Sequence, residues 1–180
     1  MPVWAAILVG LGIFLVMAAL AVGGFFAWQA YERRVLLTLL GRTEAIESVA
    51  SALIDVISRL AESPDAELEE FVSDTESTER RALHEVASRA RMLADELDTM
   101  ALPKSLVQLA EALGDAAYLV AQEASRVTDE RCGAAALEDL AGIDLGMVRA
   151  YTKQARYRLT EACERHGMDE TSVYGGGLYL

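Results

Sequence analysis

Residues 3–28 read VWAAILVGLGIFLVMAALAVGGFFAW, a run without a charged or strongly polar side chain. As an α-helix this run would be about 39 Å long, whereas the hydrocarbon core of a bilayer is about 30 Å thick. The run is therefore long enough to cross a membrane once with some tilt. Trp28 and Tyr31 stand at its end, where amphipathic rings favour the membrane interface. The stretch predicts one N-terminal transmembrane helix, with the lipid bilayer as its surroundings.

A cleaved signal peptide is the alternative interpretation of the same stretch. The apolar run is longer than a signal peptide requires, and no Lys or Arg precedes it, so an anchor is favoured. Arg33, Arg34 and Arg42 follow the span closely. Because basic residues beside a span are retained on the cytoplasmic side, we expect a single-pass protein of the cell membrane, with its N-terminus outside and its remaining chain in the cytoplasm.

Small residues recur every fourth position within the span. Ala19, Gly23 and Ala27 share one helix face, where they would let a second helix approach closely. The alternative is that Ala and Gly are simply common in membrane helices. The spacing predicts a transmembrane packing face and a homodimer formed through it.

The charge of the chain lies entirely after the span. The 180 residues carry a formal net charge of -12, and no charged side chain precedes Glu32. Such an acidic domain repels phosphate backbones, which argues against a nucleic-acid partner. The chain has only two cysteines, which suits a reducing compartment better than a disulfide scaffold.

The rest of the chain has the apolar spacing of helices and lacks the alternation of strands. The apolar stripes are Ile46, Val49, Leu53, Val56 and Leu60, then Leu83, Val86, Ala90, Leu93, Leu97 and Met100, then Leu106, Leu109, Leu113, Ala116 and Val120. We expect long helices from the span to about residue 62, over about 74–100, over about 103–129 and, without a break, over about 134–166. Ser63 and Pro64 read as the N-cap and first residue of a short additional helix.

These elements predict an all-α protein, in which the transmembrane helix continues into an antiparallel up-down-up-down four-helix bundle. Three helices completed by a partner's helix are the alternative. The expected organisation is an anchor over 1–30, a bundle over 31–167 with an acidic distal connection over 62–79, and a flexible tail over 168–180. Gly167 is expected to end the last helix.

Two segments are candidates for binding a partner protein. Between residues 62 and 79 there are eight acids and no base, among them Glu67, Glu69, Glu70 and Asp74. The tail ends in Leu178, Tyr179 and Leu180 after three glycines, an apolar tip on a flexible joint. Such a tip could insert at the membrane interface, or a partner or protease could capture it. A solvated acidic face and a frayed terminus are the simpler interpretations.

No set of residues predicts catalysis, a cofactor or a metal. The Glu-x-x-His pairs of a di-iron bundle and the glycine-rich phosphate loop are both missing from the sequence. Cys163 and His166 could supply two zinc ligands, but tetrahedral zinc needs more and only Cys132 remains. His84 follows Leu83 of an apolar stripe and reads as a boundary residue rather than a base. We therefore expect a protein that is not an enzyme.

In layout, one N-terminal span followed by a helical bundle, the chain is similar to LemA-type proteins and to membrane-anchored division scaffolds with spectrin-like helices. This resemblance implies no site residues, because no diagnostic motif of either family matches the sequence. The expected function is a membrane-anchored scaffold or adaptor. The alternative is a signalling component that relays a change through its transmembrane helix.

Overall fold

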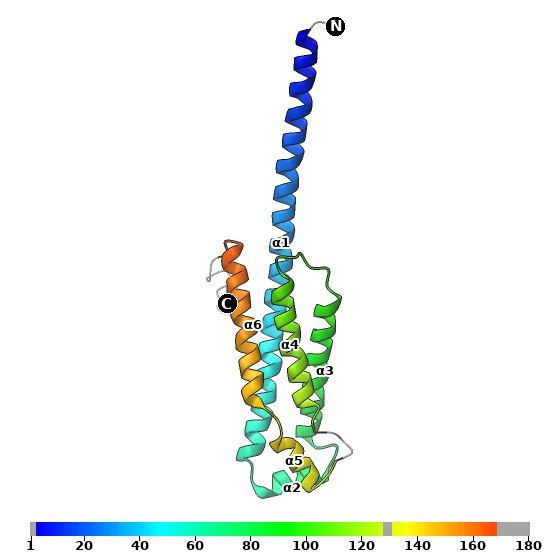
Figure 1. Cartoon of the computed structure of the whole chain (residues 1–180). Helices are drawn as coiled ribbons and strands as arrows, with labels where there is room; N and C mark the ends of the chain where they lie inside the picture. The colour runs from blue at the N-terminus through cyan, green and yellow to red at the C-terminus, as the bar shows by residue number, and fades with distance from the viewer. Residues whose placement is uncertain (1–2, 128–130, 169–180) are drawn as a thin grey trace, which may run out of the picture. The chain divides into compact units, whose positions relative to one another are not determined.

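The computed structural model describes residues 3–127 and 131–168, and within them the protein is all helical, with no strand. The helices are α1 (Val3–Glu62), α2 (Asp65–Ser73), α3 (Thr78–Thr99), α4 (Val107–Ala124), α5 (Ala134–Ala141) and α6 (Leu145–Arg165) (Figure 1). The chain divides into two compact units, Met1–Leu37 and Thr38–Leu180.

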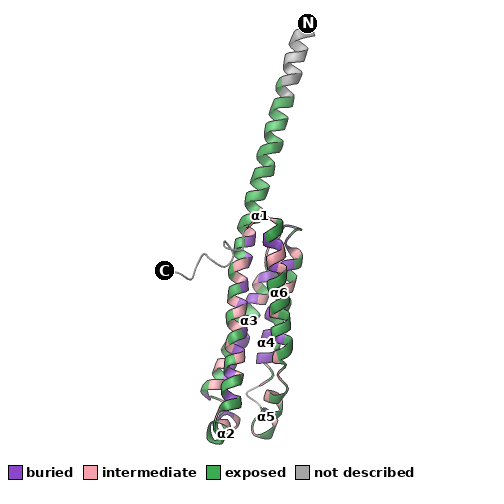
Figure 2. Ribbon diagram, turned by 90° about the vertical axis from the view of Figure 1, so that its left-hand side faces the viewer, coloured by how far each residue is buried: buried purple, intermediate pink, exposed green. Residues whose placement is uncertain are grey.

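In the first unit, α1 presents apolar side chains that nothing covers. Phe14, Leu20 and Phe25 keep 69%, 66% and 63% of their surface exposed, and Figure 2 colours the stretch of α1 around them as exposed. Among the described residues, α1 is the one helix long and apolar enough to cross a membrane. The expected candidate span is thus present as one uninterrupted helix.

The second unit is built around the three predicted apolar stripes. In it, α3 packs against α4 and α4 against α6, and Figure 1 shows these helices side by side with the second half of α1. Leu53, Leu83, Leu113 and Val120 are at most 1% exposed. Each fully buried side chain of this size contributes about 1.5–3 kcal/mol of favourable transfer free energy. The stripes are confirmed as the core, except that Val49 and Met100 are half-buried.

The start of α2 differs from its prediction. Pro64, not Ser63, is the N-cap, and it provides no side-chain hydrogen bond. The hydroxyl of Ser63 instead donates to the carbonyl of Leu60 at 2.9 Å. Ser63 therefore stabilises the last turn of α1. Phe71 of α2 is fully buried in the core of the second unit.

The second and third predicted helices are both shorter than expected. The N–H of Asp74 bonds to the carbonyl of Glu70 and ends α2, and the Ser77 hydroxyl accepts from the Arg80 N–H and begins α3. Pro103 lies in the turn before α4, where its carbonyl accepts from the Leu106 N–H at 2.9 Å. The hydroxyl of Ser125 bonds back to the carbonyl of Ala121 at 2.6 Å, where α4 ends.

The prediction of one unbroken helix over about 134–166 is wrong, because this segment forms two helices, α5 and α6. Gly142 ends α5, where its N–H donates to the carbonyls of Glu138 and Asp139. Asp144 then begins α6, where its side chain accepts a hydrogen bond from the Met147 N–H at 2.9 Å. The end of α6 is as expected. Gly167 has a φ of +63°, and Met168 donates to the carbonyl of Cys163, a left-handed glycine stop.

Candidate functional site

The predicted acidic candidates lie together on α2 and at its C-terminal end. Glu67, Glu69, Glu70 and Asp74 are all exposed. The Oδ1 atom of Asp74 accepts the Glu76 N–H at 2.8 Å, which shapes the turn to α3. With no Lys or Arg between residues 62 and 79, this short helix is a concentrated negative surface.

A buried arginine holds this acidic helix in place. Arg80 of α3 is 3% exposed, and its Nε donates to the carbonyl of Phe71 at 2.8 Å. Its guanidinium also stands 5.2 Å from the centre of the Phe71 ring, within cation–π range. Arg80 therefore satisfies a backbone carbonyl near the C-terminal end of α2, and it packs on the Phe71 ring that anchors α2 in the core.

Arg80 and a glycine also connect α2 to the segment before α5. The Nη2 of Arg80 donates to the carbonyl of Arg131 at 2.9 Å, and the N–H of Gly133 donates to the carbonyl of Val72 at 2.8 Å. Gly133 has a φ of +62°, which favours glycine at this crossing. The acidic surface of α2 is therefore fixed by contacts from α3 and from the chain before α5.

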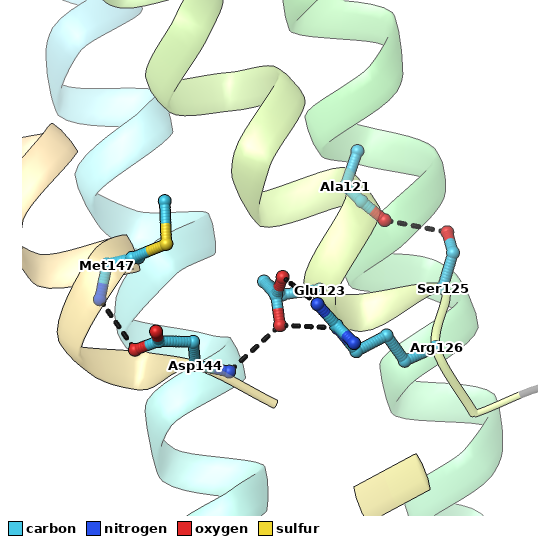
Figure 3. Close-up of polar contacts among 6 residues, drawn as sticks. All are labelled: Ala121, Glu123, Ser125, Arg126, Asp144 and Met147. Atoms are coloured by element: carbon cyan, nitrogen blue, oxygen red, sulfur yellow. Dashed lines mark hydrogen bonds and ion pairs between the residues drawn. The ribbon is translucent and has the colours of Figure 1, made fainter. Parts of the chain in front are cut away.

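A second buried charge joins the end of α4 to the start of α6 (Figure 3). Glu123 is 2% exposed. Its carboxylate accepts from Nε and Nη2 of Arg126 at 2.7 and 2.9 Å and from the Asp144 N–H at 2.9 Å. The hydrogen bond that Arg126 donates to Glu123 raises the pKa of Arg126 above its ordinary value. The cluster fixes the break between α5 and α6 and has no nucleophile or acid–base pair aimed at a cavity.

Sequence analysis did not identify Arg80 or Glu123, although both carry a signal. Arg80 precedes Leu83 by three positions, and Glu123 follows Val120 by three, so each falls on an apolar stripe. A charged side chain in such a position is buried only when it is paired. The charges on the stripes were therefore the observation that could have located both clusters.

The membrane candidates fall on α1. Ala19, Gly23 and Ala27 are exposed, and a Cβ added to Gly23 would meet nothing within 4 Å. Arg33 and Arg34 are exposed as well. In the second unit, Nη2 of Arg42 pairs with Glu96 at 3.0 Å, so Arg42 has a structural partner in α3.

A basic groove runs between the second half of α1 and the first half of α6. It has a volume of about 300 Å³, and its lining consists of Glu47, Ala50, Ser51 and Ile54 from α1 and Arg149, Thr152, Lys153 and Arg156 from α6. Three cations thus face one acid on a protein whose net charge is -12.

The histidines and cysteines of the described residues do not gather at one site. His84 is exposed beside an open groove of about 770 Å³ that also holds Arg91 and Asp95. Cys132 is exposed and Cys163 buried, and both are free. In the described ranges, no three His, Cys, Asp or Glu side chains gather as a metal site. The predicted tail residues Leu178, Tyr179 and Leu180 lie outside the described residues.

Over residues 3–127 and 131–168 the protein is all helical and has one candidate membrane-spanning helix. No protein-family model, no curated protein and no solved structure matches the chain. Functional inference therefore depends on the surfaces described above.

Proposed function

We propose that this protein is a single-pass membrane protein whose helical domain acts as a scaffold or adaptor without catalytic activity. The observation that carries the proposal is the uncovered apolar part of α1, with Phe14, Leu20 and Phe25 each more than 60% exposed. Such surface is costly in water and favourable in hydrocarbon. Because α1 continues to Glu62 as one helix, the same element would anchor the domain and contribute to its core.

The proposed orientation places the N-terminus outside and the domain in the cytoplasm. Arg33 and Arg34 lie shortly after the apolar stretch and are exposed, which supports retention of this end on the cytoplasmic side. Arg42 adds a third positive charge, although its pairing with Glu96 in the folded domain makes Arg33 and Arg34 the main determinants.

The proposed topology of the domain is up-down-up-down for the second half of α1, α3, α4 and α6. The short connection from Met100 to Leu106 between α3 and α4 favours antiparallel neighbours. In this topology α2 and α5 cap the connections at one end, where Arg80 and Gly133 hold them together. This end would present the acidic surface to a partner.

The proposed partner is another protein with a basic surface. The acids of α2 are exposed and held on a fixed helix, so a partner could bind them without first ordering the segment. Charge complementarity of this kind sets specificity and association rate and weakens with salt.

A test of the anchor and its orientation uses the full chain with a C-terminal epitope. We expect the protein in the membrane fraction, resistant to salt and alkaline washing and released by detergent. Protease added to intact cells should leave the epitope in place, and permeabilised cells should lose it. A chain that is soluble without detergent, or a domain removed from intact cells, would falsify this part of the proposal.

A test of the adaptor role compares proteins co-purified from membranes with two variants. The first neutralises the acidic surface with Glu67→Gln, Glu69→Gln and Glu70→Gln. The matched control neutralises exposed acids of α4 with Glu111→Gln and Asp115→Asn. We expect the same partner with wild type and control, and its loss from the first variant. If all three chains capture the same proteins equally, the acidic surface does not bind the partner.

A second candidate function is a relay of signals through α1. The continuity of α1 from its apolar part to Glu62 favours it, because a rigid helix can pass a rotation or a piston movement along its axis. Helix-breaking glycines inserted beside Leu36 separate the two functions. A relay should fail with this insertion, whereas a tether should still hold the domain at the membrane and bind its partner.

A further inference from the structure

Two cations of the basic groove between α1 and α6 have no ion-pair partner among the described residues. Arg149 and Lys153 are exposed, and neither forms an ion pair with any residue in the described part of the chain. Arg156 is different, since it lies 3.7 Å from Glu47 across the groove. Ala50 and Ile54 supply apolar surface between the charges. The groove thus combines free positive charge with an apolar floor, which suits an acidic helix.

We propose that this groove binds the acidic α2 of a second copy of the chain. The exposed acids Glu67, Glu69 and Glu70, with Asp74 after them, form a concentrated negative helix of known structure in the same protein. The two surfaces have opposite charge, and both are exposed on helices that pack in the second unit. The contact involves only the second unit and does not depend on the membrane anchor.

The charges on the two helices have similar spacing. Within α2 the exposed acids Glu67 and Glu70 are three residues apart, and within α6 the exposed cations Arg149 and Lys153 are four residues apart. At 1.5 Å per residue the two acids lie about 4.5 Å apart along their helix axis and the two cations about 6 Å apart. Two acid–base pairs can therefore form together when one helix lies along the other.

Within one chain this pairing does not occur. The α2 helix contacts α3 and α5, and Phe71 and Arg80 fix it there. The groove is lined by α1 and α6 alone. The exposed acidic face of α2 on a second copy is thus a complementary surface that is present wherever the protein is concentrated.

The contact uses different surfaces on the two copies, so it is heterologous. Such a contact closes into a ring or continues as an open chain. Exposed ion pairs of this kind are weak singly and are screened by salt. We therefore expect reversible clustering that depends on concentration and ionic strength, which adds self-assembly to the adaptor role.

The test measures the mass of the full chain in uncharged detergent by sedimentation. Measurements at roughly 0.01 M and roughly 1 M salt set the Debye length to about 30 Å and about 3 Å. One variant reverses the groove with Arg149→Glu and Lys153→Glu, and the other reverses the helix with Glu67→Lys and Glu70→Lys. We expect salt-sensitive self-association of the wild type and at least a tenfold rise in its dissociation constant in either variant.

The decisive measurement mixes the two variants. Each has one surface that is complementary to a surface of the other, so the equimolar mixture should regain association that neither variant shows alone. Controls reverse exposed charges outside both surfaces, with Arg81→Glu plus Lys104→Glu and with Glu111→Lys plus Asp115→Lys. These controls should associate as the wild type does, and circular dichroism should show unchanged helix content in all variants.

Three results would overturn the proposal. The first is wild-type association that is absent, or equal at both salt concentrations. The second is a loss of association with the groove variant alone, which would assign the groove to a different acidic ligand. The third is a mixture that stays as dissociated as its components. A dimer through the transmembrane helix is told apart by salt, which should not change it, and by a Gly23→Leu background, which should weaken it.

Discussion

The carboxylate of Glu123 accepts a hydrogen bond from the backbone N–H of Asp144 at 2.9 Å, across 21 positions of sequence. Asp144 is itself the N-cap of α6 and accepts from the Met147 N–H. Glu123 therefore fixes the residue at which α6 begins. Two hydrogen bonds from Arg126 complete the coordination of the buried carboxylate and offset its negative charge.

We expect Glu123→Ala to lower the free energy of unfolding by about 1–3 kcal/mol, because it leaves the Asp144 N–H without its partner. Arg126 is 42% exposed at its side chain, so water compensates part of its loss. Denaturant unfolding followed by circular dichroism measures the change. Glu111→Ala, an exposed acid on the same helix, should change stability by no more than about 0.5 kcal/mol. Equal effects of the two substitutions would show that the buried contact contributes nothing specific.

The anchoring of α2 by Phe71 gives a second prediction. Phe71 is fully buried and is the largest such side chain of the second unit, so Phe71→Ala should cost about 3–5 kcal/mol, and Phe71→Leu clearly less. Hydrogen exchange should show the largest loss of protection over Asp65–Ser73. Unchanged protection of that helix in the alanine variant would mean that Arg80 alone holds it.

The core was predictable from sequence because its apolar residues repeat with the period of a helix. Leu53, Leu83 and Leu113 fall on stripes three and four residues apart and are buried as that spacing requires. The helix ends were less predictable. Ser63 is of a residue type that is common at N-caps, yet its hydroxyl donates to a carbonyl of the preceding helix. The sequence pattern does not distinguish a serine that caps the next helix from one that bonds back to the preceding helix.

The break between α5 and α6 depends on long-range contacts that a local pattern does not contain. Glycine weakens a helix, so Gly142 marks a local weak point, but the partner of Asp144 is Glu123 on another helix. The basic groove is a similar case. Lys153 and Glu47 are distant in sequence, and only the packing of α6 beside α1 brings their surfaces together. The acidic surface, in contrast, is contiguous in sequence and was predicted directly.

The two cysteines should differ strongly in reactivity. Cys132 is exposed and Cys163 is 3% exposed in the core, and burial raises the pKa of the Cys163 thiol above its ordinary value. Since the thiolate is the reactive form, a disulfide reagent should modify Cys132 quickly in the folded protein. It should modify Cys163 only after unfolding. Cys132→Ser should remove the fast reaction. Rapid modification of that variant would contradict the burial of Cys163.

The stability of α6 should depend on pH through Glu161. A hydrogen bond from Arg165, and then one from Arg158, holds the pKa of Glu161 below its ordinary value of 4.5. Because the pKa is lower in the folded state, this contribution to stability is complete above about pH 4.5 and is lost as the pH falls through the folded-state pKa. Glu161→Gln should therefore lower Tm most at neutral pH and progressively less in acid. A deficit that stays constant with pH would rule out the ionised carboxylate as its cause.

The proposed packing face of α1 can be tested with two neighbouring glycines. A Cβ at Gly23 or at Gly24 would meet nothing within 4 Å, so leucine at either position fits the helix itself. Only Gly23 shares a face with Ala19 and Ala27, because successive residues are about 100° apart around a helix. Gly23→Leu should thus destabilise the dimer by about 1–3 kcal/mol through overpacking, whereas Gly24→Leu should not. Energy transfer between labelled chains in vesicles measures both. The two variants have the same composition and hydrophobicity, so an equal loss of dimer in both would point to a general effect of side-chain bulk. No loss of dimer in either variant would mean that this face does not pack against a second helix.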